Sequence, residues 1–214
     1  MGDIMLNNKG FDLWAEGYDK AVGLSCEEKS YPFAGYKDVL AQIYQRVLHK
    51  EKAVVLDIGF GTGTLTTKLY EQGCEIYGQD FSEKMIALAC AKMPDAHLYQ
   101  GDFAQQLVSQ LTEKTYDFVI ATYSLHHLTD IGKVAFLHTV LELLNDNGKI
   151  LIGDIAFETQ VDLDNCKEAA GEEWDDEEFY FVAENLKKEF PNIYFEKVSY
   201  CAGVFILEKR DTVK

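Results

Sequence analysis

The segment DIGFGTG, residues 57–63, decides the fold of this chain. It follows the apolar run AVVL at residues 53–56 and precedes a stretch with the pattern of a helix. Three glycines at alternate positions, Gly59, Gly61 and Gly63, let the backbone turn tightly after a strand and let a ligand approach the main chain closely. The segment therefore predicts a ligand-binding turn between a strand and a helix.

The acidic residue that opens this segment indicates the charge of the ligand. A loop built for a pyrophosphate offers bare amide groups and the positive end of a helix, and a carboxylate there would repel the anion. Asp57 therefore favours a ligand that presents a positive charge.

Apolar runs alternate with amphipathic stretches along the chain, which is typical of an α/β protein with a mostly parallel sheet. Only two residues separate the last two predicted strands, so this pair is expected to run antiparallel at the sheet edge. We expect a doubly wound, seven-stranded, mostly parallel sheet with an antiparallel edge strand. Strands are predicted at residues 53–58, 75–79, 97–100, 118–122, 149–155, 193–200 and 203–208, and helices at 36–48, 65–72, 82–92, 130–144 and 175–190.

Composition narrows the class of protein. With 214 residues, 47% of them hydrophobic, the chain can bury a core as a single domain, in which residues 1–50 form a helical cover and residues 51–214 the sheet core. The net charge of −16 opposes binding to nucleic acid and to anionic membranes. The five cysteines are scattered, and no apolar run is long enough to cross a bilayer, so we expect a cytoplasmic protein with reduced thiols.

Two further acids follow the second and third predicted strands. In a doubly wound sheet, the acid that closes the second strand lies beside the first loop, where the carboxylate of Asp80 can accept the hydroxyl hydrogens of a ribose. Asp102, after the third strand, can accept a hydrogen from an adenine amino group. The rings of Phe81 and Phe103 are candidates to pack near the base, although either ring can instead belong to the core.

One strand-end acid is often only a helix cap or a solvated loop residue, but three are harder to explain separately. Asp57, Asp80 and Asp102 all fall at the carboxyl edge of the predicted sheet, where open α/β sheets bind ligands. Together they predict one pocket for a nucleoside that carries positive charge.

With these residues in view, the chain resembles the class I S-adenosylmethionine-dependent methyltransferases. Within that superfamily, FDLWAEGYD at residues 11–19 and TYSLHHLT at 122–129 look like the small methyltransferases called YrrT-like. The resemblance implies a Rossmann-like methyltransferase fold, S-adenosyl-L-methionine as cofactor, and cofactor contacts from Gly59, Asp80 and Asp102. It rests on DIGFGTG at 57–63, DFS at 80–82 followed by Met85 and Ile86, GDF at 101–103, and YDFV at 116–119 running into SLHHL at 124–128.

The charges agree with that resemblance, because the sulfonium and ammonium of this cofactor would be attracted to Asp57. Methyl transfer needs alignment of the acceptor and exclusion of water, and it needs a base only if the acceptor arrives protonated. His126 and His127 are the candidate bases, with packing under the cofactor as the structural alternative. No third ligand stands at an informative spacing from them, so no metal is expected.

Aromatic residues before the first strand and after the fourth are candidates for the acceptor side. Trp14 and Tyr18 share one face of a short predicted helix, which packs on the domain or acts as a lid, and Tyr123 follows the fourth strand. The segment ATYS at 121–124 lacks the Asp/Asn-Pro-Pro-Tyr pattern of enzymes that methylate amino groups of nucleic acids. A small-molecule acceptor is therefore expected.

Two other functions stay open at this point. A NAD(P)-binding oxidoreductase would use the three glycines for a dinucleotide and Asp80 for its ribose, but Asp57 disfavours it, as does Thr64 where that fingerprint has glycine or alanine. A non-catalytic S-adenosylmethionine-binding protein would keep the pocket without the reaction. Methyl transfer requires no obligatory catalytic side chain, so the sequence does not separate this non-catalytic function from catalysis.

Overall fold

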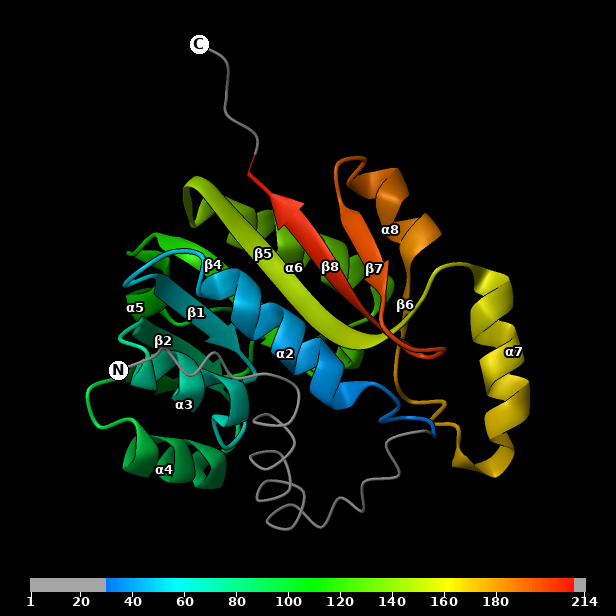
Figure 1. Cartoon of the computed structure of the whole chain (residues 1–214), viewed down its shortest axis with the longest axis horizontal. Helices are drawn as coiled ribbons and strands as arrows, with labels where there is room; N and C mark the ends of the chain where they lie inside the picture. The colour runs from blue at the N-terminus through cyan, green and yellow to red at the C-terminus, as the bar shows by residue number, and fades with distance from the viewer. Residues whose placement is uncertain (1–29, 210–214) are drawn as a thin grey trace, which may run out of the picture.

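The computed structural model describes residues 30–209, in which strands and helices alternate along the chain (Figure 1). The strands are β1 (Val54–Ile58), β2 (Glu75–Asp80), β3 (His97–Gln100), β4 (Tyr116–Thr122), β5 (Leu144–Phe157), β6 (Phe181–Val182), β7 (Tyr194–Lys197) and β8 (Ala202–Glu208). The α-helices are α2 (Tyr36–Val47), α3 (Thr64–Glu71), α4 (Glu83–Lys92), α5 (Ser109–Thr112), α6 (Asp130–Glu142), α7 (Gln160–Ala170) and α8 (Ala183–Glu189). Two short 3-10 helices are η1 (Leu125–His127) and η2 (Gly171–Glu173).

The strands form a sheet in the order β3-β2-β1-β4-β5-β8-β7, and the short β6 pairs with β5. The neighbours from β3 to β5 run parallel, whereas β8 runs antiparallel to both β5 and β7. This confirms the doubly wound, mostly parallel sheet with an antiparallel pair at one edge. The strand order reverses between β1 and β4, and open α/β sheets bind ligands in the crevice at such a point.

Helices cover both faces of the sheet, with α2 in front of it and α6 behind it in Figure 1. The helix predicted at residues 36–48 is confirmed as α2, and its apolar residues are buried against the sheet. The helix comes very close to β5 at Gly153, where an added Cβ would lie 2.3 Å from Cγ1 of Val39. Glycine at this position therefore sets the distance between helix and sheet.

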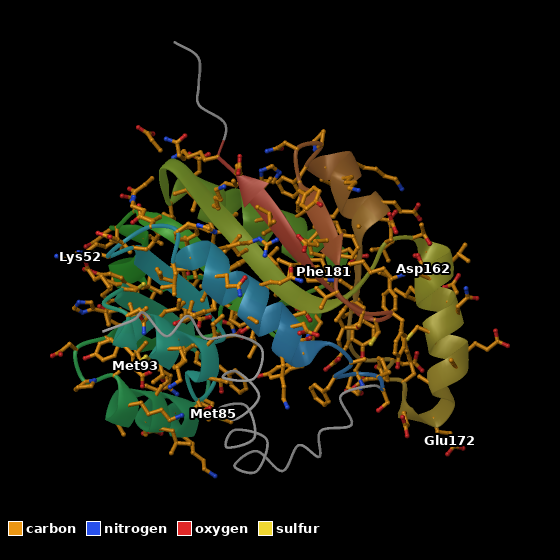
Figure 2. The ribbon with its side chains drawn as sticks, in the orientation of Figure 1. Lys52, Met85, Met93, Asp162, Glu172 and Phe181 are labelled. Atoms are coloured by element: carbon orange, nitrogen blue, oxygen red, sulfur yellow. The ribbon has the colours of Figure 1, made fainter. Side chains whose placement is uncertain are left out.

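The prediction of a helix at residues 175–190 was wrong in its first half. Tyr180 and Phe181 are buried, and Phe181 lies in β6 beside β5, so tertiary contacts outweigh the local preference for helix. The helix proper is α8, which begins at Ala183. Glu172, the first residue of the acidic run at 172–178, is exposed in the 3-10 helix η2 that directly follows α7 (Figure 2).

Helix α7 was not predicted, although the sequence carries a signal for its start. The hydroxyl of Thr159 accepts the N–H of Asp162, and the Asp162 carboxylate accepts the N–H of Thr159, which is a capping box. Other boundaries moved by a few residues: α6 ends at Glu142, because β5 begins as early as Leu144, and β7 is short because residues 198–201 form the turn to β8. Among residues 30–209, no helix has the length and apolar character needed to cross a membrane.

Candidate functional site

The glycine segment forms the tight turn that its sequence predicts. Gly59, Gly61 and Gly63 have φ angles of 69°, 56° and 75°, in the left-handed region that glycine adopts without a steric penalty. The N–H of Gly59 donates to the carbonyl of Gln79 on β2 at 2.8 Å, and Gly63 is the N-cap residue of α3. The turn is therefore fixed to the neighbouring strand on one side and opens into a helix on the other.

Asp57, near the end of β1, is buried, and one of its two carboxylate oxygens has no hydrogen-bond partner among the described residues. Its side chain is 1% exposed, and one oxygen accepts a hydrogen bond from the hydroxyl of Thr66. The other oxygen, Oδ1, has no hydrogen-bond partner within residues 30–209. Burial raises the pKa of Asp57 to about 7; the Thr66 hydroxyl opposes this rise, and the charge of Asp80 adds to it. A donor or a positive charge beside Oδ1 would satisfy this carboxylate.

Asp80 is the last residue of β2 and holds the glycine turn in shape. Its Oδ2 accepts the N–H of Gly61 and its Oδ1 accepts the N–H of Ser82, both at 2.8 Å. The predicted position of Asp80 beside the first loop is confirmed. The carboxylate is 4% exposed, and its role toward a ribose stays a prediction.

Of the residues after β3, Asp102 lies in an exposed turn and Phe103 lies in the hydrophobic core. Asp102 is exposed, and its carboxylate accepts hydrogen bonds from the N–H of Ala104 and the side-chain amide of Gln105, both at 2.9 Å. Phe103 is buried, with its ring centroid 5.9 Å from that of Phe136, so this ring belongs to the core. Phe81 is 67% exposed. Of the two rings proposed to pack near a base, Phe81 is therefore the one with a free face.

A cavity of about 330 Å³ joins the glycine turn to the residues that follow β4. It brings together many of the residues that the sequence singles out, whereas Gly63, Asp80, Phe81, Asp102 and Phe103 are not part of its wall. The lining residues are Pro32, Phe33, Tyr36, Leu40, Asp57, Gly59, Phe60, Gly61, Thr64, Leu65, Thr122, Tyr123, His126, His127, Ile155 and Glu178.

A larger hollow of about 480 Å³ lies elsewhere, between α6 and α8. Its wall includes Ile131, Val134, Phe181 and Leu186, and it contains no residue of the glycine turn. The strand-end acids and the histidine pair are likewise missing from its wall. The smaller cavity is therefore the candidate site, because the polar groups converge there.

Tyr123 follows β4 in a conformation that is uncommon for a residue with a side chain. Its φ is 50°, and such left-handed positions cost about 1–3 kcal/mol and cluster at functional sites. Its ring centroid lies 4.9 Å from that of Tyr36, and its buried hydroxyl has no hydrogen-bond partner in the described part of the chain. Burial, with a smaller contribution from the charge of Asp154, raises the pKa of Tyr123 well above its usual value. The other two acceptor-side candidates, Trp14 and Tyr18, lie outside the described residues.

His126, in η1, is buried between two carboxylates. Its Nδ1 lies 2.6 Å from Oδ1 of Asp154, and its Nε2 lies 3.4 Å from Oε1 of Glu178. Burial alone would lower the pKa of His126, but the charges of Asp154 and Glu178 outweigh burial and raise it. The side chain is thus held in one orientation by Asp154.

Backbone contacts dock the segment that carries Glu178 onto η1. The N–H of Phe179 donates to the carbonyl of His126 at 2.8 Å, and the buried ammonium of Lys133 donates to the carbonyl of Phe179. His127 lies beside them with its side chain exposed, and its pKa is lowered, first by the partial loss of contact with water and then by the charge of His126. Glu178 therefore meets both histidines at the cavity wall.

Sequence reasoning missed both carboxylates of this cluster. Asp154 carried a signal, because it is a lone acid in the apolar run ILIGDIAF at residues 150–157. Glu178 carried no such signal, because nothing in the sequence distinguishes it from the other acidic residues at 172–178. Folding alone singles it out.

Comparison with known proteins identifies the family. Residues 55–148 match the family model described as methyltransferase domain. An uncharacterized methyltransferase of a Geobacillus species (strain WCH70) is 37% identical over 181 residues, covering 84% of this chain and 80% of the relative. Another, from Alkaliphilus oremlandii, is 31% identical over 199 residues, covering 93% of this chain and 87% of the relative.

Solved structures share the fold at lower identity. Magnesium protoporphyrin IX methyltransferase from Synechocystis, with bound SAH, has a TM-score of 0.66 and 18% identity, with 96% of each chain covered. A TehB-like SAM-dependent methyltransferase from Corynebacterium glutamicum has a TM-score of 0.60 and 17% identity, covering 95% of this chain and all of that one.

The glycine turn and Asp57 fit the cofactor of this family, S-adenosylmethionine. The ammonium group of this cofactor can pair with the Asp57 oxygen that has no hydrogen-bond partner among the described residues. The finer resemblance to the YrrT-like proteins stays a prediction. The chain belongs to the class I S-adenosylmethionine-dependent methyltransferases.

Proposed function

We propose that this protein transfers the methyl group of S-adenosylmethionine to a small molecule, and that the methionine end of the cofactor and the acceptor meet in the 330 Å³ cavity. The proposal rests on the residues that line this cavity. They include Asp57, whose Oδ1 has no hydrogen-bond partner among the described residues, together with His126 and His127. A cavity of this size lies at the lower end of the range for small-molecule pockets, about 300–1,000 Å³. The proposed acceptor is accordingly a small molecule and not a segment of nucleic acid.

The residues divide between donor and acceptor in this proposal. Asp57 pairs with the ammonium of the cofactor, Asp80 and Asp102 receive hydrogens from its ribose and adenine, and Phe81 packs against the base. Tyr123, His126 and His127 contact the acceptor. A lone pair of the acceptor attacks the methyl carbon in line with the carbon–sulfur bond, whose electrons return to sulfur to give a neutral thioether. Any proton on the attacking atom leaves to the histidine pair or to water.

The charge of the cavity restricts the class of acceptor. Asp57 and Glu178 lie in its wall, and Asp154 lies directly behind His126. None of the described residues in that wall is a lysine or an arginine. A carboxylate or phosphate group on the acceptor would find no cationic side chain there, so we propose a neutral or cationic acceptor.

Cofactor affinity is expected to depend on pH because of Asp57. With a pKa of about 7 in the unliganded protein, Asp57 is mostly neutral below pH 7 and mostly ionised above it. Only the carboxylate attracts the ammonium of the cofactor, so affinity should rise from pH 6 to pH 8, by as much as about tenfold per pH unit below the pKa. Calorimetric titrations across this range measure the effect. The variant Asp57→Asn should bind more weakly and show a flat profile, and an equal slope in both proteins would contradict the pairing.

A screen with labelled methyl donor tests the acceptor. Purified protein is incubated with S-adenosylmethionine that carries a labelled methyl group and with a cell extract split into small molecules, proteins and nucleic acids. We expect label in the small-molecule fraction, and far less with Asp80→Ala. Label confined to proteins or nucleic acids would contradict the proposal, as would tight cofactor binding with no transfer to any fraction.

A further inference from the structure

The contact between His126 and Glu178 is chemically incomplete. His126 uses Nδ1 for Asp154, so in the neutral ring the other nitrogen, Nε2, presents a lone pair. That nitrogen lies 3.4 Å from the Oε1 of Glu178, another electron-rich atom. A direct charge-assisted hydrogen bond would measure about 2.7–2.9 Å. The gap between these two atoms is longer than such a bond, and when the ring is neutral a metal ion between them would satisfy both lone pairs.

The separation of 3.4 Å suits two ligands on one metal ion. With bonds of about 2.0–2.1 Å and tetrahedral angles, neighbouring ligand atoms lie about 3.3–3.4 Å apart. His127 supplies a third ligand atom, and all three atoms lie within 4.8 Å of one another. Metal binding would require the longer of these separations to shorten, and the exposed side chain of His127 is the one that would turn toward the ion.

Groups behind the cluster hold its members in place. The two oxygens of Asp154, which is 1% exposed in its side chain, also accept the N–H groups of Ile155 at 2.8 Å and Leu125 at 3.2 Å. A carboxylate that fixes Nδ1 while Nε2 stays free is the usual support of a metal-binding histidine. The ring of Tyr180 lies beside His126, with the two ring centroids 6.3 Å apart.

We propose that His126, His127 and Glu178 bind a divalent transition-metal ion such as Zn²⁺, with Asp154 as the residue that orients His126. Two histidines and one glutamate leave a fourth position open, which is typical of catalytic zinc sites and not of structural ones. All three ligands lie in the cavity wall, so the open position faces the cavity. This proposal departs from the sequence-based expectation of no metal, which was made without Glu178 because Glu178 is distant in the sequence from the histidine pair.

The role of the ion in methyl transfer rests on the proposed function. As a Lewis acid, a bound ion would favour loss of a proton to water from an acceptor atom that it contacts, because the metal-bound histidines would no longer be free to accept it. It would also offset the negative charge of the cavity. The acceptor class that fits is a small molecule with a hydroxyl, thiol or amine that ligates a metal ion.

Metal titration of the purified full-length chain, without cofactor, tests the site. After removal of metals by a chelator, Co²⁺ is added and its visible absorption recorded, and Zn²⁺ affinity is measured by competition. We expect one ion per chain and a Co²⁺ spectrum of low coordination number. Asp154→Asn should weaken binding about 10–100-fold, the usual effect of losing an outer-shell carboxylate, and His127→Gln or Glu178→Gln should weaken it more.

Glu177→Gln provides the matched control, because Glu177 is the exposed neighbour of Glu178 in the same acidic run. It should keep the affinity of the unchanged protein. Urea unfolding of each variant checks that the fold is intact. Absence of stoichiometric binding would overturn the proposal, and so would equal affinities of Glu178→Gln and Glu177→Gln. Because this titration uses no methyl donor, its failure is distinguishable from failure of the methyl-transfer screen.

Discussion

Replacing Asp80 with alanine is expected to weaken binding of S-adenosylmethionine about 100-fold. The carboxylate accepts the N–H groups of Gly61 and Ser82, both at 2.8 Å, so its removal strands two backbone donors and releases the glycine turn. Hydrogen bonds to charged groups contribute about 1.5–3 kcal/mol each, and about 1.4 kcal/mol corresponds to tenfold in affinity. The proposed ribose contact would add to this loss. Isothermal titration calorimetry measures the change directly.

Two further variants make this result interpretable. Asp80→Asn keeps one acceptor oxygen, so its loss of affinity should be smaller than that of the alanine variant. Asp95→Ala removes an exposed aspartate that accepts only a surface hydrogen bond from Tyr70 among the interactions described, and it should bind the cofactor normally. If Asp80→Ala binds within about threefold of the unchanged protein, less than 1 kcal/mol, Asp80 does not shape the site.

Replacing Gly59 with alanine is expected to destabilise the protein and to abolish most cofactor binding. An added Cβ would lie 2.5 Å from the Cβ of Ser124, whose hydroxyl donates to the carbonyl of Ile58 at 2.8 Å. The φ of 69° adds backbone strain for any residue with a side chain. Overpacking of this kind costs about 1–3 kcal/mol, and the left-handed conformation about 1–2 kcal/mol more. Urea unfolding and calorimetric titration measure the two effects.

Gly73→Ala separates the two causes. Gly73 has a φ of 83°, but among residues 30–209 no atom other than those of its chain neighbours lies within 4 Å of an added Cβ there, so the variant carries the strain without the clash. It should lose less stability than Gly59→Ala and keep its cofactor affinity. Equal losses in the two variants would mean that the close approach of the glycine turn to Ser124 is unimportant.

The half of the fold that surrounds β1 could be predicted because local chemistry determines it. A buried apolar run followed by three glycines with left-handed φ leaves few alternatives to a strand, a tight turn and a helix. The structure of the chain after β5 depends instead on contacts between segments that are distant in the sequence. Phe181 joins β5 through contacts that no local pattern reveals, and for this reason the predicted helix at 175–190 was wrong at its start.

The candidate site likewise contains residues that could be predicted from the sequence and one that could not. Asp57 and the histidine pair meet because the carboxyl ends of β1 and β4 are neighbours in a doubly wound sheet, and sequence reasoning anticipates that. The position of Glu178 depends on how its segment docks on η1, through the N–H of Phe179 and the carbonyl of His126. Three-dimensional packing alone distinguishes it from the other acids at residues 172–178.

We expect residues 57–63 and the strand-end acids to form a pocket for a cationic nucleoside. Calorimetric titration of the unchanged protein with S-adenosylmethionine and, separately, with NAD tests it most directly. The geometry predicts one bound S-adenosylmethionine per chain, with no measurable heat from NAD, because Asp57 attracts an ammonium and repels a pyrophosphate. Saturable binding of NAD with no binding of S-adenosylmethionine would contradict the account.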